Sequence, residues 1–250
     1  MNQTPPLSWL TERPIAHRGL HEAGTERVEN SKPAIIAAMD AGYAIEVDVQ
    51  LTKDLGVVVM HDRTLERLTA HSGNLTDMTL SDVTAIEVTG SNSTIMSLQE
   101  LLDLVDGKVP LFIELKVTRQ DNPNALPAAM RDALLAYKGQ LAVMSFHPLA
   151  IKYFKEKAPS IVRGMVLEES KQRFRLNKGL RRSRYCKIAD AQFVAHDIKS
   201  LPNRFSKNWR AAGHPLVTWT VNTQELEARA SQHADQPIFE TPAVTGPLHG

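Results

Sequence analysis

The sequence contains a single cysteine, Cys186, among 250 residues. One cysteine excludes an internal disulfide and any zinc site built from several cysteines, and it fits a reducing compartment. No stretch approaches the roughly 18 consecutive apolar residues that a membrane span requires. Residues 1–13 also lack the basic start and apolar core of a secretory signal. We therefore expect a cytoplasmic protein without a transmembrane segment.

Large charge imbalance and glycine-rich nucleotide motifs are absent as well. The formal net charge is +1, which gives no overall electrostatic support for binding nucleic acid. Neither the dinucleotide-binding glycine fingerprint nor the P-loop pattern occurs, so nothing predicts a nucleotide cofactor. Locally, residues 171–187 carry eight Lys and Arg and no acid. This basic run leaves open a transient contact with an anionic membrane surface, or a helix face that is simply solvated.

Short apolar runs rich in β-branched residues alternate with longer stretches of helical periodicity along the whole chain. That alternation is typical of a parallel sheet wrapped by helices, and the length of the chain suits a single barrel. We expect an α/β fold, a (β/α)8 TIM barrel, with one domain spanning residues 1–250. The predicted strands are residues 15–17, 44–49, 57–60, 111–115, 141–145, 164–167, 192–195, 217–221 and 238–240.

Nine predicted strands are one more than the barrel needs, and the third is the one that does not fit. Residues 50–56 are too short a connection for a parallel crossover, which takes about a dozen residues. The third predicted strand, residues 57–60, is therefore expected to form a hairpin with the second strand, with the turn at residues 53–56. Residues 62–97 are expected to form a small insertion after the second strand. Helices are expected to begin near Ser31 and Ser97, with these serines as N-caps.

Three acidic residues lie on two predicted strands. Glu46 and Asp48 are two apart, so their side chains point to the same face of the strand, into the barrel. Glu114 ends a further strand, and the carboxyl ends of barrel strands converge on one rim. Buried carboxylates are neutralised by protonation, by paired cations or by a metal, and three oxygen donors favour Mg²⁺ or Ca²⁺. The alternative is a salt-bridge network with Arg18 and Lys116.

Two histidines also end or follow predicted strands in the first half of the chain. His17 and His61 predict a pair for proton transfer, because imidazole titrates near neutral pH. Arg18 and Lys116 would supply fixed positive charge for phosphate oxygens, or balance the acids.

These residues, in this order, resemble the glycerophosphodiester phosphodiesterase family. The matching motifs are His17-Arg18-Gly19, Glu29-Asn30, Glu46-x-Asp48, His61-Asp62 and Glu114-x-Lys116. The resemblance extends through residues 97–102, 145–146 and 219–222, so it spans nearly the whole chain. Two departures are Ile95-Met96, where a proline is common, and residues 239–242, which replace the usual Thr-Asp ending of the last strand.

The resemblance implies a role for each of these residues. Glu46, Asp48 and Glu114 would hold one divalent cation, and His17 and His61 would be the acid and base. Arg18 and Lys116 would contact the phosphate, with Glu29, Asn30 and Asp62 in support. Trp219 would line the substrate pocket.

The implied reaction is metal-dependent hydrolysis of small glycerophosphodiesters to glycerol 3-phosphate and an alcohol such as choline or ethanolamine. The nucleophile could be water or the adjacent glycerol hydroxyl. Two other readings stay open: a lysophospholipase D or sphingomyelinase-like activity on acylated lipids, and a non-catalytic protein that binds phosphate esters.

Overall fold

The computed structural model describes residues 7–168 and 178–240. Within these residues, strands form a closed parallel barrel, in the spatial order β1-β9-β8-β7-β6-β5-β4-β2, with β2 pairing back onto β1. The barrel strands are β1 (Ile15–Ala16), β2 (Ala44–Leu51), β4 (Leu111–Leu115), β5 (Leu141–Ser145), β6 (Val162–Leu167), β7 (Phe193–Asp197), β8 (Leu216–Val221) and β9 (Gln236–Phe239). The predicted (β/α)8 barrel is confirmed.

The ninth strand, β3 (Val57–Val59), runs antiparallel to β2, with Val59 opposite Val49. The hairpin predicted from the short connection is therefore confirmed. Its turn is closed by a hydrogen bond from the Thr52 backbone N–H to the Gly56 carbonyl, with N and O 2.9 Å apart. Gly56 is needed there because an added Cβ would lie 2.6 Å from Cβ of Leu80.

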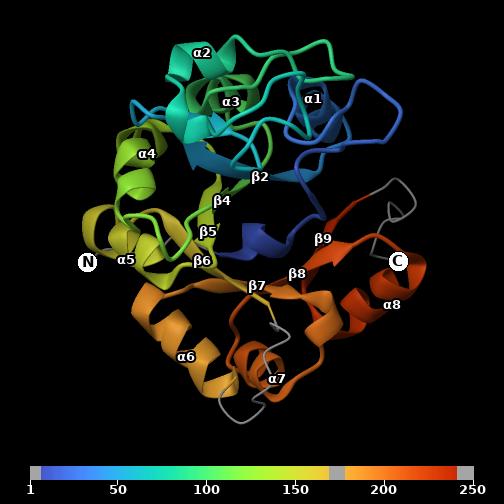
Figure 1. Cartoon of the computed structure of the whole chain (residues 1–250). Helices are drawn as coiled ribbons and strands as arrows, with labels where there is room; N and C mark the ends of the chain where they lie inside the picture. The colour runs from blue at the N-terminus through green and yellow to red at the C-terminus, as the bar shows by residue number, and fades with distance from the viewer. Residues whose placement is uncertain (1–6, 169–177, 241–250) are drawn as a thin grey trace.

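Helices surround the barrel on its outer side (Figure 1). They are α1 (Lys32–Asp40), α3 (Leu98–Val105), α4 (Ala125–Ala136), α5 (Pro148–Lys157), α6 (Lys178–Ala189), α7 (Arg204–Ala211) and α8 (Gln224–His233), with 3₁₀ turns η1 (Ser8–Thr11) and η4 (Ile198–Ser200). None of the helices in the described residues is long and apolar enough to cross a membrane.

The two predicted N-caps have different outcomes. Ser97 caps α3 as expected, in a reciprocal capping box with Glu100. Ser31 occupies the N-cap position of α1 as predicted, but its side chain accepts no hydrogen bond from the helix, so only the side-chain cap is missing. Pro33 stands at the second helical position and has no N–H, which removes one of the two groups that a capping oxygen normally contacts.

The barrel interior is packed with apolar side chains from all eight barrel strands. Phe112 and Phe193 meet edge to face there, with ring centroids 5.8 Å apart. Trp9 of η1 packs against Phe112 and closes one end of this interior cluster. Gly164 leaves room for Phe193, because an added Cβ would lie only 2.3 Å from the phenyl ring.

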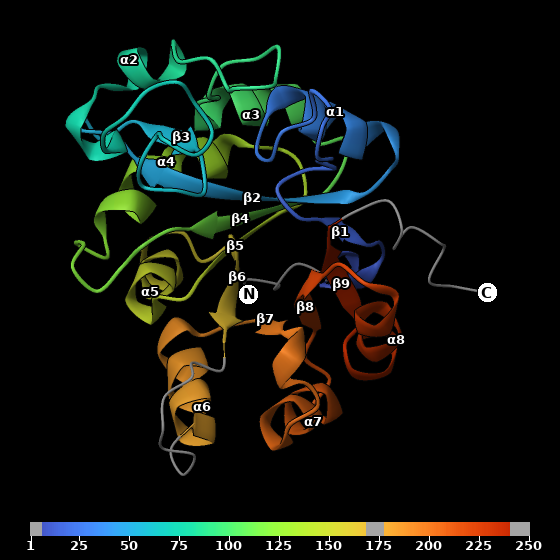
Figure 2. The ribbon, with the colours of Figure 1, turned by 45° about the vertical axis from the view of Figure 1, so that its right-hand side comes forward.

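Between β3 and α3 the chain forms a small layer of its own above one side of the barrel (Figure 2). It contains η2 (Leu75–Asp77) and α2 (Leu80–Thr84), and α2 begins at a capping box between Thr79 and Asp82. Its apolar side chains form a cluster separate from the barrel core, made of Val58, Met60, Leu65, Leu75, Val83, Ile86, Val88 and Ile95. This layer carries the loop that brings His61, Asp62 and Arg67 toward the barrel rim.

Candidate active site

The three acidic residues expected to bind a cation converge on one buried spot. Strands β2 and β4 are neighbours, and their register places Asp48 directly opposite Glu114. Glu46 lies two residues earlier on β2, on the same face. One carboxylate oxygen from each of the three lies within 4.8 Å of the others, and all three residues are buried.

Two cations contact this cluster, as the salt-bridge alternative anticipated. Nζ of Lys116 lies 2.8 Å from Oδ1 of Asp48 and 2.7 Å from Oε1 of Glu114, and Nε of Arg18 lies 3.1 Å from Oδ2 of Asp48. Glu46 forms no salt bridge with Lys or Arg in the described part of the chain, and its Oε1 is buried without a hydrogen-bond partner. Three carboxylates against two cations leave an excess of negative charge.

The electrostatics of the cluster follow from burial and from this imbalance. Burial, together with the negative charges of Asp48 and Glu114, raises the pKa of Glu46 well above its usual range. Burial also raises the pKa of Glu114 to about 7, although Lys116 opposes the shift. For Asp48, burial alone would raise the pKa, but the charges of Lys116 and Arg18 outweigh it and lower the pKa. Without a further cation, burial and mutual repulsion therefore favour the protonated forms of Glu46 and Glu114.

His17 follows β1 and stands at the edge of the acidic cluster. Its Nε2 lies 3.7 Å from Oε2 of Glu46, and its Nδ1 lies 2.6 Å from Oε1 of Glu240. Since a carboxylate accepts, Nδ1 carries the proton and Nε2 is left unprotonated, facing the cluster. Burial lowers the pKa of His17, and the hydrogen bond to Glu240 partly offsets this.

Glu240 is a site residue that the sequence analysis missed as a functional group. It follows β9, which pairs with β1, so it reaches His17 although the two are 223 positions apart. Hydrogen bonds with His17 and His21 lower the pKa of Glu240, so it is ionised. A signal existed in the sequence: the last strand of a closed barrel lies beside the first, and Glu240 ends the last strand. Thr241 and Pro242, part of the same departure, lie outside the described residues.

His61 is oriented by its own neighbour in the chain. Nδ1 of His61 lies 2.7 Å from Oδ1 of Asp62. Arg67 contacts the second oxygen of Asp62 and lowers its pKa to about 2. Arg67 also forms two hydrogen bonds of 2.7 Å to Glu29. Sequence reasoning did not identify Arg67, because it belongs to none of the recognised motifs.

Glu29 closes this network onto the acidic cluster. Its Oε1 accepts a hydrogen bond of 2.8 Å from Nη1 of Arg18, the same side chain that pairs with Asp48. Asn30 donates from Nδ2 to Oδ2 of Asp48 over 3.1 Å, and its Oδ1 accepts from the Asp48 backbone N–H over 3.3 Å. The structure thus joins the predicted supporting residues into one hydrogen-bonded frame around both histidines.

The backbone after β1 explains the His-Arg-Gly motif. Arg18 and Gly19 both have positive φ, at 54° and 78°. A Cβ on Gly19 would lie 2.8 Å from the carbonyl carbon of Ala34, so only glycine fits at this left-handed position. This tight turn directs the Arg18 side chain and its backbone N–H toward β2, where that N–H donates to Oε2 of Glu46 over 3.1 Å.

Trp219 stands on β8, on a different part of the rim from the carboxylates. Its Nε1 donates to the carbonyl of Ala195 over 3.1 Å, and its ring meets Phe146 edge to face with centroids 5.6 Å apart.

Comparison with known proteins identifies the family and the fold of this chain. The model of the glycerophosphoryl diester phosphodiesterase family matches residues 17–238. Glycerophosphodiester phosphodiesterase 1 from Bos taurus is 25% identical over 252 residues, which covers 88% of this chain and 74% of that protein. The Bacillus subtilis protein YhdW is 28% identical over 235 residues, which covers 86% and 88%.

Two solved structures show the same fold. A phosphodiesterase from Oleispira antarctica in complex with the product sn-glycerol-3-phosphate has a TM-score of 0.78 at 21% identity, covering 92% of this chain and 93% of that one. A glycerophosphodiester phosphodiesterase from Thermotoga maritima has a TM-score of 0.71 at 22% identity, covering 92% and 94%. The match of the family model over most of the chain shows that this chain belongs to the glycerophosphoryl diester phosphodiesterase family, a family of phosphoric diester hydrolases.

Proposed function

We propose that this protein hydrolyses glycerophosphodiesters to glycerol 3-phosphate and an alcohol, using one divalent cation and the pair His17 and His61. The observation that carries the proposal is the convergence of three buried carboxylates beside a histidine whose other ring nitrogen is held by Glu240. The related Oleispira antarctica enzyme has sn-glycerol-3-phosphate as its product, which supports the same product here.

The residues of the acidic cluster fit a hard cation. Glu46, Asp48 and Glu114 offer oxygen donors alone, which Mg²⁺ and Ca²⁺ prefer, and Oε1 of Glu46 is buried without a partner. A cation bound there would neutralise charge that builds on the phosphoryl oxygens. We propose Mg²⁺ or Ca²⁺ as this cation.

His17 and His61 divide the two proton transfers. We assign the base to His17, because its Nε2 faces the carboxylate cluster while Nδ1–H is donated to Glu240. As the nucleophile's oxygen bonds to phosphorus, its proton passes to Nε2 of His17. His61, held at Nδ1 by Asp62, protonates the alcohol oxygen as its bond to phosphorus breaks. The nucleophile is water, or the glycerol hydroxyl that would give a cyclic phosphate for water to open.

Arg18 and Lys116 have two tasks in this scheme. Both are ion-paired with the carboxylates, so they hold the cluster together before substrate arrives. Their remaining N–H groups would donate to phosphate oxygens, with Glu29 hydrogen-bonded to Arg18 and Asn30 hydrogen-bonded to Asp48. Trp219 would form part of the pocket wall.

Substitution of the histidines tests the assignment. His17→Ala and His61→Ala should each lower turnover of glycerophosphocholine by about 10² to 10⁴, the usual contribution of a positioned acid or base. His71→Ala, in the layer above the barrel, is the matched control and should keep wild-type activity. Release of glycerol 3-phosphate is the readout, and near-normal activity in either variant of the pair would refute the assignment.

The alternatives left open by the sequence are separated by two comparisons. An enzyme for acylated lipids would hydrolyse an acylated substrate faster than glycerophosphocholine. A non-catalytic binder would release no product, whereas this enzyme should lose turnover in EDTA and regain it with Mg²⁺ or Ca²⁺.

The cytoplasmic location stays a prediction from the sequence, and residues 171–177 of the basic run lie outside the described chain.

A further inference from the structure

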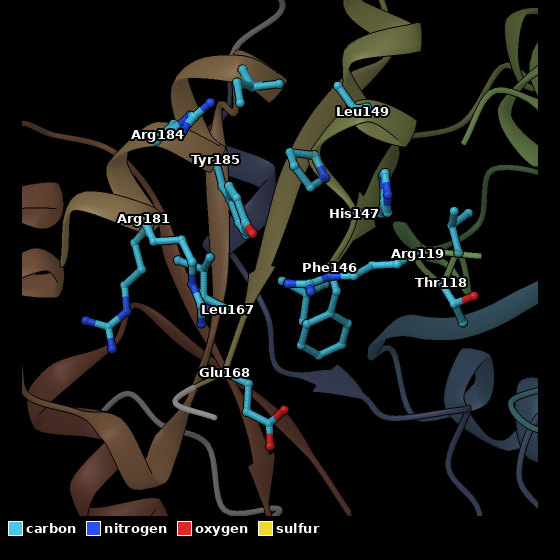
Figure 3. Close-up of a pocket in the computed structure, with 15 residues that line it drawn as sticks. Thr118, Arg119, Phe146, His147, Leu149, Leu167, Glu168, Arg181, Arg184 and Tyr185 are labelled. Carbon is cyan, nitrogen blue, oxygen red and sulfur yellow. The ribbon is translucent and has the colours of Figure 1, made fainter. Parts of the chain in front are cut away.

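A second cavity opens on the same rim of the barrel, beside the catalytic residues. Its volume is about 690 Å³, and its walls come from the ends of β4, β5 and β6, from the start of α5 and from α6. Figure 3 shows Arg119 extending from one side and Tyr185 from the other, with their polar ends directed toward the space between them. None of the residues assigned to catalysis lines it.

The cavity adjoins the catalytic site on two sides. Thr118 in its wall is two residues after Lys116, so their Cα atoms are at most about 7 Å apart. Arg63, two residues after His61, donates from Nη1 to Oγ1 of Thr118 over 3.1 Å. Phe146, also in the wall, meets the ring of Trp219. A diester whose phosphate lies near Lys116 could therefore extend its alcohol group into this cavity.

The lining is strongly positive. Among the described residues it includes four arginines, Arg119, Arg181, Arg182 and Arg184, and one acid, Glu168. In the described part of the chain, Arg119, Arg181 and Arg184 have no salt-bridge partner, and Arg181 lies over the Tyr185 ring at 5.9 Å. The wall also holds His147, whose Nδ1 is buried without a hydrogen-bond partner. Like charges gathered around a cavity repel one another unless an anion enters.

We propose that this cavity receives the alcohol group of the diester and selects an alcohol that itself carries a phosphate or a carboxylate. The proposal rests on the proposed function for the reaction at the neighbouring site. Arg119, Arg181 and Arg184 would donate charge-assisted hydrogen bonds to the second anion, with Nδ1 of His147 as a further partner. A choline or ethanolamine group would bring a positive charge into a positive cavity, so such diesters are the poorer substrates.

The test compares two soluble substrates, glycerophosphocholine and bis(glycerophospho)glycerol, which carries a second phosphodiester. The wild-type enzyme should show at least about tenfold higher kcat/KM for the anionic substrate. Arg119→Ala should remove about tenfold from that value without lowering kcat/KM for glycerophosphocholine, and Arg119→Glu should reverse the preference. Arg131→Ala, whose arginine pairs with Asp132 on the surface of α4, is the control and should change neither.

Calorimetry keeps this proposal separate from the proposed function. The affinity for bis(glycerophospho)glycerol is measured in the His61→Ala variant and in the double variant that also carries Arg119→Ala. A weaker affinity in the double variant supports the cavity even when no diester is hydrolysed. Equal kcat/KM for the two substrates, or an equal loss for both in Arg119→Ala, overturns the proposal. The proposal is also overturned if Arg119→Ala abolishes binding of the protein to phosphatidylglycerol vesicles but leaves the substrate preference unchanged. The arginines would then contact a lipid surface.

Discussion

Replacing Glu46 with glutamine should remove cation binding while leaving the cation-free fold intact. Two unit charges 4.8 Å apart repel by about 3.5 kcal/mol at an effective dielectric constant of 20. Burial and this repulsion raise the pKa of Glu46 well above its usual range, which favours the neutral side chain when no cation is bound. Glutamine is nearly isosteric with that neutral acid, and the free energy of unfolding should change by less than ~1 kcal/mol.

With the cation present, the two proteins should diverge. A ligand at 100 times its Kd stabilises the folded state by about 2.7 kcal/mol. For a chain of this size that amounts to a rise in Tm of about 5–11 °C. We expect this rise for the wild type in Mg²⁺ or Ca²⁺, and none for Glu46→Gln.

Thermal unfolding with and without EDTA measures both quantities. Glu156→Gln is the matched control, because Glu156 is exposed on α5 and pairs only with Lys152 in the described residues. It should respond to the cation as the wild type does. An equal cation-dependent rise in Glu46→Gln would show that the cation binds elsewhere, and a loss of several kcal/mol without cation would show that Glu46 is charged and paired.

Three further predictions concern other groups. The pKa of Glu114 is raised to about 7, so below that pH a proton occupies a ligand oxygen of Glu114. Cation affinity measured by calorimetry should fall at least about tenfold per pH unit as the pH drops below 7, and a flat profile would contradict this. Burial raises the pKa of the Cys186 thiol to about 12, so alkylation at pH 8 should be about a thousandfold slower in the folded protein than in urea, and equal rates would show an accessible thiolate. Gly164→Ala should lower the free energy of unfolding by about 1–3 kcal/mol, because the added Cβ overlaps the ring of Phe193. The second substitution Phe193→Leu should restore part of that stability. An unchanged stability in Gly164→Ala alone would show that the ring can move.

Most of the fold could be predicted because each strand is a short apolar run that stands out from the helical stretches on either side. All nine predicted strands overlap strands of the structure. The antiparallel β3 followed from the length of one connection, a constraint that needs no knowledge of the rest of the chain. The missing side-chain cap at Ser31 is also local in origin: a suitable residue type stood at the right position, but the neighbouring proline removed a hydrogen-bond donor.

The candidate site could be predicted less completely. Acids on β2 and β4 are placed by strand register, so Glu46, Asp48 and Glu114 come together as expected. The carboxylate partner of His17 depends instead on which strands meet when the sheet closes. Arg67 reaches Glu29 and Asp62 through the irregular path of the layer above the barrel, and no periodicity encodes such a path.

The hydrogen bond between His17 and Glu240 crosses the seam where β1 meets β9. Its donor and acceptor come from opposite ends of the described chain. A chain that has folded every strand but the last has its acidic cluster in place and its base unanchored. Recovery of full turnover during refolding therefore measures the closure of the barrel. It should lag behind any spectroscopic signal that reports the first strands alone.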